Sequence, residues 1–304
     1  FTDFYCTWKD GELMADNYRK VKQVLWTILF ANLLVAALKI IVGVMIRSSS
    51  MTADGFHSIT DGSSNIVGLI GIHFASQPVD ENHPYGHSKF EMMAGLVIAG
   101  MLFVMGGKII IDAISRFFHP VVPEVTLESI VVLIFTLCVN IFVSRYEYKK
   151  GKALNSQILI SDSLHTKSDI YISLGVLLTL VCIKIGLPPV IDPLASLVVA
   201  GFILFAAYEI LCDNGDILLD RAVVDPDEIS KIVMSFEHVK DVHNIRSRGS
   251  RRDMHIDMHI VTEHDLSVEE CHDLMHKIED KIRSVINKKV QVLAHIEPYK
   301  RSKR

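Results

Sequence analysis

The sequence has few features of a secreted scaffold or of a hydrolase. Its five cysteines are scattered and no C-x-x-C pair occurs among them, which argues against a disulfide framework and against a zinc ribbon. It also lacks the H-E-x-x-H motif of zinc proteases and the G-x-S-x-G motif of serine hydrolases. The formal net charge is only −4, so there is no overall preference for nucleic acid or for an anionic partner. We therefore expect neither an enzyme nor a nucleic-acid-binding protein.

Long apolar runs dominate the first two thirds of the chain. Half of its 304 residues are hydrophobic and the mean hydropathy is +0.33, which is high for a soluble enzyme of this size. A helix needs roughly 20 mostly apolar residues to cross a bilayer. Candidate spans lie at 23–46, about 50–77, 91–117, 126–145, 155–186 and 189–212. The sequence therefore predicts a bundle of six transmembrane helices within residues 1–212, surrounded by a lipid bilayer.

Positive residues are distributed unevenly among the loops. They gather before the first span and between the fourth and fifth, at Arg19, Lys20, Lys22, Arg145, Lys149, Lys150 and Lys152. The loops on the other side hold only Arg47 and Lys184. The excess of positive charge on cytoplasmic loops then places both termini in the cytoplasm. Since no organelle-targeting segment is recognisable, we expect a multi-pass protein of a bacterial plasma membrane.

The composition becomes charged and mixed from about residue 213. "DPDEISKIVMSFEHV" is typical of a capped amphipathic helix, and "DVHNIRSRGSRRDMHIDMHIV" of two strands around a turn. Residues 267–286 predict a second helix that starts from the capping-box pattern Ser267-x-x-Glu270, and "VQVLAHIEP" (290–298) predicts a last strand. The order α-β-β-α-β indicates a small cytosolic α+β domain of ferredoxin-like fold at 213–304.

Two spans, those at about 50–77 and 155–186, share the motif Asp-x-x-His-x-x-x-Asp in their polar first halves. It occurs at Asp54, His57 and Asp61, and again at Asp162, His165 and Asp169. In a helix each set forms one stripe, so two facing helices would bring imidazoles and carboxylates together. Two His and two Asp can complete a tetrahedral shell for a dication such as zinc, which would offset the carboxylate charge. One stripe alone is better explained by pairing with Lys167 or backbone, or by a polar helix end that lines a wet crevice; its repetition at matching depth favours a metal.

Two further groups of histidines have ligand-like spacing. In "QPVDENHPYGHSKFE" (77–91), Asp80, His83 and His87 form Asp-x-x-His-x-x-x-His, although a loop rich in Pro and Gly is also compatible with a turn that exposes its histidines. In "RDMHIDMHIV", period-two alternation places His255 and His259 on one face of a strand and the apolar residues on the other. The polar face of that strand is therefore available for binding.

Taken together, these motifs resemble the cation diffusion facilitator family over nearly the whole chain. The resemblance implies six transmembrane helices with a cytosolic ferredoxin-like domain, a homodimer, and exchange of divalent metal for protons. It implies a transport site of His57, Asp61, His165 and Asp169. It also implies a loop site of Asp80, His83 and His87, and a cytosolic cluster of His243, His259, His272, His295 and Glu297. Glu297 stands where close relatives often have Asp, which leaves the stoichiometry of the cluster open.

The expected function is zinc efflux by alternating access with protons as counter-substrate, zinc also being the expected ligand of the cytosolic domain. The donor set suits zinc's tetrahedral preference and would also accept cadmium, cobalt or ferrous iron. A manganese or ferrous iron exporter of the same family is the alternative, because manganese-selective relatives tend to have more oxygen-rich quartets. From other classes, a membrane-anchored metal sensor would need only the cytosolic histidines, and an intramembrane metalloenzyme would need a catalytic motif.

Overall fold

The chain divides into two compact units, Phe1–Asn214 and Gly215–Arg304. The computed structural model describes residues 2–45, 58, 62–118, 127–185, 188, 190–250, 253–286 and 290–299. The division falls two residues beyond the boundary expected at 212.

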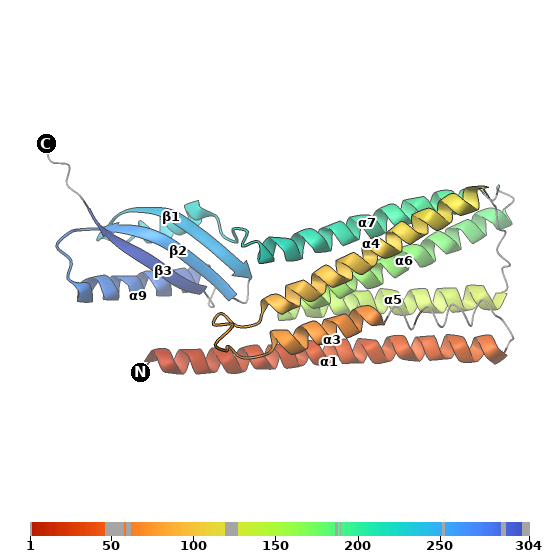
Figure 1. Ribbon diagram of the computed structural model, residues 1–304, viewed down its shortest axis with the longest axis horizontal. Helices are drawn as coiled ribbons and strands as arrows, with labels where there is room; N and C mark the ends of the chain where they lie inside the picture. Colours follow the sequence, from red (N-terminus) through yellow and green to blue (C-terminus); the bar gives the residue numbers. More distant parts are fainter. Residues whose placement is uncertain are drawn as a thin grey trace. The chain divides into compact units, whose positions relative to one another are not determined.

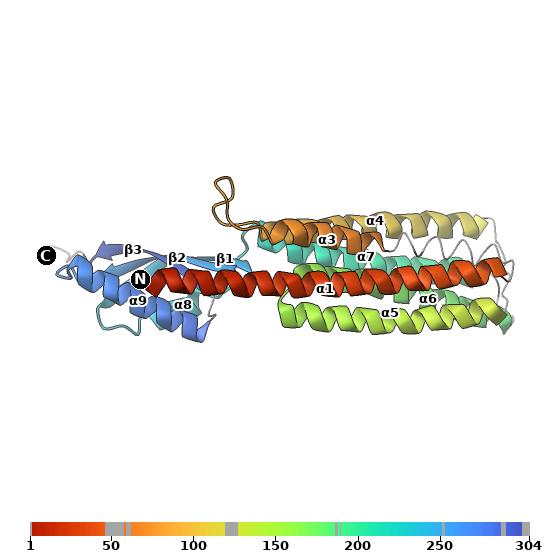
Figure 2. The same cartoon turned by 90° about the horizontal axis from the view of Figure 1, so that it is seen from below.

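The first unit is built of long helices that run side by side (Figures 1 and 2). They are α1 (Thr2–Met45), α3 (Ser63–Ala75), α4 (Lys89–Phe118), α5 (Leu127–Leu154), α6 (Gln157–Lys184) and α7 (Ile191–Leu218). Helix α6 contacts α3, α4 and α5, and α1 contacts α3 and α5. The first half of α6 is therefore enclosed by other helices.

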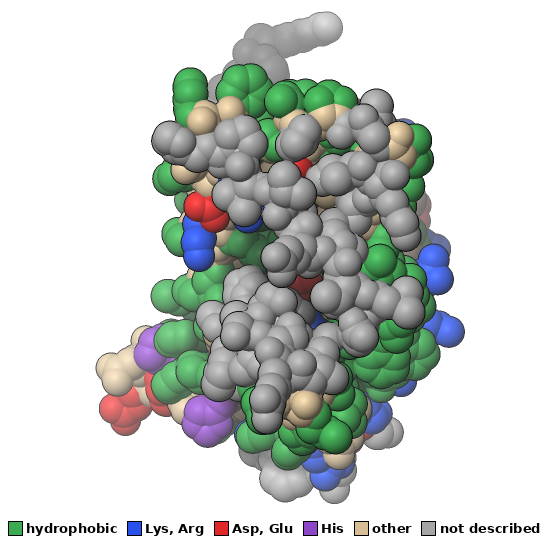
Figure 3. Space-filling model, turned by 90° about the vertical axis from the view of Figure 1, so that its right-hand side faces the viewer, with side chains coloured by type: hydrophobic (Ala, Val, Ile, Leu, Met, Phe, Trp, Pro, Cys, Tyr) green, Lys and Arg blue, Asp and Glu red, His purple; other side chains and the backbone are tan. Residues whose placement is uncertain are grey.

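Among the described residues, four helices are long and apolar enough to cross a membrane. These segments are Asp16–Val42, Lys89–Phe118, Ile130–Leu154 and Ile191–Leu218. Large apolar side chains on their outer faces are exposed, for example Phe30, Val104 and Phe205, and hydrophobic side chains are prominent around the grey residues in Figure 3. Exposed apolar surface of this extent fits lipid surroundings rather than water. Helix α6 is as long as α7 and begins with a polar half.

The interior of the first unit is packed with aliphatic side chains and small residues. Leu25, Ile98 and Leu102 are fully buried in one hydrophobic cluster. Helices α3 and α4 approach so closely that a Cβ added at Gly71 would lie 2.4 Å from the Cβ of Ala94. Close approach at small residues is a usual way for membrane helices to gain packing contacts.

The second unit is a three-stranded sheet with two helices. Its elements are α8 (Pro226–Val233), β1 (Val239–Ser250), β2 (Asp253–Thr262), α9 (Val268–Val285) and β3 (Val290–Pro298). The sheet order is β1-β2-β3, with β1 and β2 antiparallel and β2 and β3 parallel. Asp225 caps α8, and Ser267 with Glu270 forms a capping box at α9. The predicted α-β-β-α-β order and the capping box are confirmed.

One face of this sheet is buried and the other is open. Met254, Ile256, Met258 and Ile260 alternate along β2 and are buried in a cluster with residues of α8 and α9. The intervening side chains of β2, including His259, are only partly buried. The predicted alternation of β2 is therefore confirmed, and histidines line its open face.

Candidate metal sites

The predicted transport site is described only in part. His165 and Asp169 lie one turn apart on α6, and His165 is only 5% exposed. His57 and Asp61, together with Asp54, lie outside the described residues. A polar helix half at membrane depth is tolerated where protein rather than lipid surrounds it, and α6 meets that condition through α3, α4 and α5.

Helix α6 begins at a carboxylate supplied by another helix. The buried side chain of Glu91, on α4, accepts hydrogen bonds from Ser156 Oγ (2.5 Å) and from Ile158 N (3.2 Å). The first backbone N–H groups of a helix have no partner within the helix and carry partial positive charge. Glu91 satisfies one of them and thereby sets where the polar half of α6 starts.

The sequence did not indicate Glu147, although the structure buries it completely beside the predicted site. It lies on α5, and its Oε2 accepts a hydrogen bond from Thr166 Oγ1 at 3.0 Å, next to His165 in the chain. In the sequence Glu147 lies between Arg145 and Lys149, and this charged segment predicts a solvent-exposed glutamate. The only usable signal is helical spacing, because Ser144 and Glu147 fall on the same buried face of α5.

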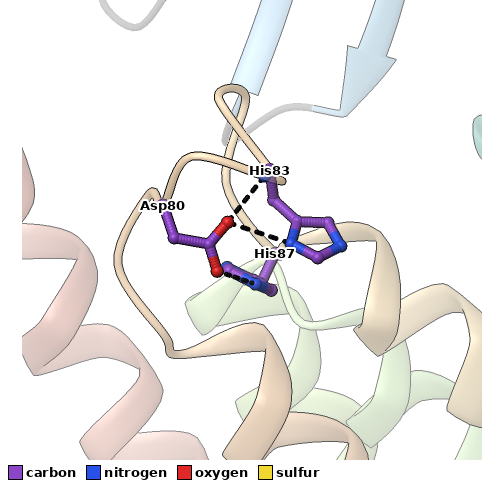
Figure 4. A group of neighbouring side chains, drawn as sticks. All are labelled: Asp80, His83 and His87. Atoms are coloured by element: carbon purple, nitrogen blue, oxygen red, sulfur yellow. Dashed lines mark hydrogen bonds and ion pairs between the residues drawn. The ribbon is translucent and has the colours of Figure 1, made fainter.

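The loop between α3 and α4 brings Asp80, His83 and His87 together (Figure 4). One ligand atom from each residue lies within 4.8 Å of the others. Asp80 Oδ1 is 3.1 Å from His83 Nδ1, and Asp80 Oδ2 is 3.3 Å from His87 Nε2. Ligand atoms ~2.0–2.2 Å from one ion lie roughly 3.3–3.6 Å apart, so small side-chain rotations suffice for metal binding.

Backbone hydrogen bonds keep the Asp80 carboxyl ionised. The backbone N–H groups of Asn82 and His83 donate to its Oδ1 at 3.0 and 2.6 Å. The hydrogen bond from the His83 backbone, with a smaller contribution from the His83 ring, lowers the pKa of Asp80 below its usual value. His87 is 6% exposed, and its buried Nδ1 has no hydrogen-bond partner. Asp80 thus offers an ionised carboxylate, and the neighbouring His87 ring has a nitrogen without a hydrogen bond. Together they form a donor set that suits a divalent cation.

A row of imidazoles crosses the open face of the sheet. Strand register sets His243 opposite His259, and His259 opposite His295. Their ring centroids are 5.3 and 5.0 Å apart. Glu297 closes the row: its Oε1 is 2.8 Å from His259 Nδ1 and its Oε2 is 3.7 Å from His243 Nε2. His243, His259 and Glu297 hold ligand atoms within 4.8 Å of one another.

The hydrogen bond from His259 lowers the pKa of the Glu297 carboxyl below the usual range. His272, which the resemblance places in the same cluster, is not in that group of three. It lies on α9, where its Nε2 is 3.1 Å from His276 Nε2. The described geometry therefore gives a row on the sheet and a separate histidine pair on the helix.

These features define a class of protein: a multi-pass membrane protein with two described clusters of side chains of the kinds that ligate metals. Two family models match the chain, the cation efflux transmembrane domain at residues 25–219 and the cytoplasmic domain of cation efflux proteins at 224–299. The chain belongs to the cation efflux family, the cation diffusion facilitators, and is a transporter of divalent metal cations.

Relatives are similar along most of their length. The chain is 34% identical to the uncharacterized transporter MJ0449 of Methanocaldococcus jannaschii, over 88% of this chain and 95% of that one. It is 29% identical to the manganese efflux system protein MneP of Bacillus subtilis, over 94% and 99% of the two chains. A cadmium, cobalt and zinc/H(+)-K(+) antiporter of Bacillus subtilis is 26% identical over 79% and 78%.

Proposed function

We propose that the protein exports zinc from the cytoplasm in exchange for protons, as a homodimer. The observation that carries the proposal is the placement of His165 and Asp169, one turn apart, in the enclosed polar half of α6. His57 and Asp61 would complete the quartet. Two imidazoles and two carboxylates suit the tetrahedral coordination of zinc.

The topology is part of the same proposal. Six spans, with α3 forming part of the second and α6 the fifth, would place both termini and the second unit in the cytoplasm of a plasma-membrane protein. The second unit would have a ferredoxin-like fold and hold regulatory metal on the row of His243, His259 and His295 with Glu297. Asp80, His83 and His87 would bind metal in the cytoplasmic loop between the second and third spans, and His272 would join the cytosolic site.

Coupling to protons follows from the donor chemistry. Metal binding requires a neutral imidazole and an ionised carboxylate, so protons and metal compete for the same lone pairs. In an inward-facing state the quartet would take up metal from the near-neutral cytoplasm. In an outward-facing state, protonation of an imidazole from a more acidic exterior would expel it.

Manganese is the second candidate substrate. The similarity to the manganese efflux protein MneP extends over nearly the entire chain and favours it. The two His of the quartet favour zinc, because manganese prefers oxygen ligands.

Metal-dependent proton flux in proteoliposomes tests the proposal, with zinc and manganese compared for the wild type, Asp169→Asn and Glu209→Gln. Glu209 is an exposed acidic residue of α7, so its variant controls for loss of one charge in a membrane helix. We expect zinc-driven proton flux in the wild type and in Glu209→Gln, and none in Asp169→Asn. Manganese flux without zinc flux would keep the mechanism and change the substrate. Absence of flux with either ion, in protein that binds metal, would favour the sensor.

A further inference from the structure

Two carboxyl groups meet in the interior of the helical unit without a lysine or arginine beside them, although His165 interacts electrostatically with Asp162. Glu147 on α5 and Asp162 on α6 are both 0% exposed, and their carboxyl groups lie within hydrogen-bonding reach of each other. No described Lys or Arg forms an ion pair with either residue. Burying one charge without a partner is costly, and burying two adjacent like charges is more so.

A chain of hydrogen bonds fixes the orientation of Asp162. Asn32 Nδ2, on α1, donates to Asn65 Oδ1 at 3.0 Å, so the amide nitrogen of Asn65 is the atom that turns toward α6. That nitrogen donates to Asp162 Oδ2, and Ser64 hydrogen-bonds to Asp162 as well. A donor at Oδ2 stabilises the ionised form of the carboxylate.

Among the described residues, the remaining oxygen of each carboxyl group faces no donor other than the neighbouring carboxyl group. Thr166 Oγ1 donates a hydrogen bond to Glu147 Oε2, whereas no hydrogen bond to the buried Glu147 Oε1 is formed by another described side chain. Asp162 Oδ1 is likewise buried without a partner. Buried polar atoms in native proteins are nearly always satisfied, so two such oxygens on neighbouring carboxyl groups need either a proton shared between them or a cation.

We propose that Glu147 and Asp162, supported by Asn65 and Thr166, form an additional all-oxygen site for a divalent cation. Asp162 precedes His165 by three residues, which is about 4.5 Å along the helix axis. The proposal rests on the proposed transport function: in that topology the site lies on the cytoplasmic side of the quartet and holds the ion before it reaches His165 and Asp169. Carboxylate and hydroxyl oxygens favour hard ions, so this site takes Mn²⁺ more readily than the His-containing quartet does.

Binding is tested directly with Mn²⁺ as the probe. Free Mn²⁺ has a sharp electron paramagnetic resonance signal that is lost on binding, so titration of the purified full-length protein counts bound ions. We expect Glu147→Gln to bind one Mn²⁺ per chain fewer than the wild type. The matched variant Glu209→Gln should bind the wild-type number, and Asp169→Asn should keep the ion that Glu147→Gln loses. A wild-type count in folded Glu147→Gln would overturn the proposal.

Two further variants separate a ligand role from a packing role. Thr166→Val removes the hydrogen bond to Glu147 and leaves the charge of Glu147 in place. It should therefore retain the ion with an affinity about tenfold lower, because a metal ligand that loses its hydrogen-bond partner typically binds less tightly. Glu147→Asp keeps the charge on a shorter stem and should also retain the ion. If Glu147→Gln does not fold, Asp162→Asn takes its place and should lose the same ion. If Thr166→Val abolishes binding as fully as Glu147→Gln, the residues act through packing and the proposal fails.

Transport gives a readout that distinguishes this site from the quartet. Glu147→Gln should raise the KM for the metal that the wild type transports at least about tenfold while proton-coupled flux persists at saturating metal, whereas Asp169→Asn should remove flux altogether. If the wild type transports neither ion, the proposed function fails, and the Mn²⁺ count in Glu147→Gln still decides whether the site exists.

Discussion

Replacement of Glu91 should destabilise the protein more than any exposed acidic substitution in the same helices. Its carboxylate is 1% exposed and receives hydrogen bonds from Ser156 Oγ at 2.5 Å and Ile158 N at 3.2 Å. A hydrogen bond to a charged group contributes about 1.5–3 kcal/mol, so the two together contribute about 3–6 kcal/mol. Glu91→Ala removes both and leaves two buried donors without an acceptor.

Glu91→Gln retains an acceptor oxygen but loses the charge that faces the N-terminus of α6. Its cost should be about 1–2 kcal/mol, the range for a charge at a partly buried helix end. The order of stability is therefore wild type, then Glu91→Gln, then Glu91→Ala. A role in packing alone would make the glutamine variant equal to the wild type, because the side chains have nearly the same shape.

Thermal or denaturant unfolding of the purified full-length protein in detergent measures these differences, with Glu209→Ala as the control. A double-mutant cycle between Glu91→Ala and Ser156→Ala should give a coupling free energy of about 1.5–3 kcal/mol, because the two side chains share one hydrogen bond. If Glu91→Ala costs no more than the ~0.5 kcal/mol typical of an exposed position, Glu91 does not cap α6.

Two further changes test packing and pH dependence. Gly71→Ala should lower the melting temperature, because the new methyl group would lie 2.4 Å from the Cβ of Ala94. Gly100→Ala is the control and should not lower it, because nothing lies within 4 Å of the added methyl group. Equal melting temperatures of the two variants would contradict the close α3–α4 contact. The hydrogen bond from His259 lowers the pKa of Glu297 below its usual value of 4.5. The stability that this hydrogen bond gives the folded protein is therefore fully present above pH 4.5 and is lost as pH falls through the lowered pKa. Glu297→Gln should accordingly reduce the fall in stability below pH 4.5, as measured by unfolding at graded pH; an unchanged acid slope would contradict the hydrogen bond.

Local sequence patterns predicted most of the second unit. A capping box at Ser267 and alternation along β2 depend only on residues close in the chain, and both were confirmed. The row of histidines was not predictable from spacing. His243 and His295 belong to different strands, and only the pairing of both strands with β2 sets them beside His259.

In the first unit, the sequence predicted the positions of the helices but not which of their charged side chains are buried. Hydropathy predicts where helices lie, but it does not distinguish a charge that faces lipid headgroups from one that faces inward. Glu147 is buried because α5 and α6 pack along that side of the helix, and Glu91 because it meets the start of α6. Apart from the helical spacing of Ser144 and Glu147, such contacts between helices leave no mark in a local pattern, so both residues look like ordinary polar positions in the sequence.

The two halves of α6 are held in physically different ways. In the first half, Asp162, Ser163 and Thr166 are hydrogen-bonded to residues of α3 or α5, and Ser161 accepts a hydrogen bond from Asn214 of α7. From Ile170 onward, among the residues that the structure describes, no side chain of α6 hydrogen-bonds to another helix; contacts there are apolar or aromatic, such as Tyr171 against Phe202. Hydrogen bonds are directional and are lost over small displacements, whereas apolar contacts tolerate sliding. Movement of α6 against its neighbours therefore costs least in the half that lies beyond His165 and Asp169, the predicted metal ligands, whereas the residues that flank His165 remain hydrogen-bonded to α3 and α5.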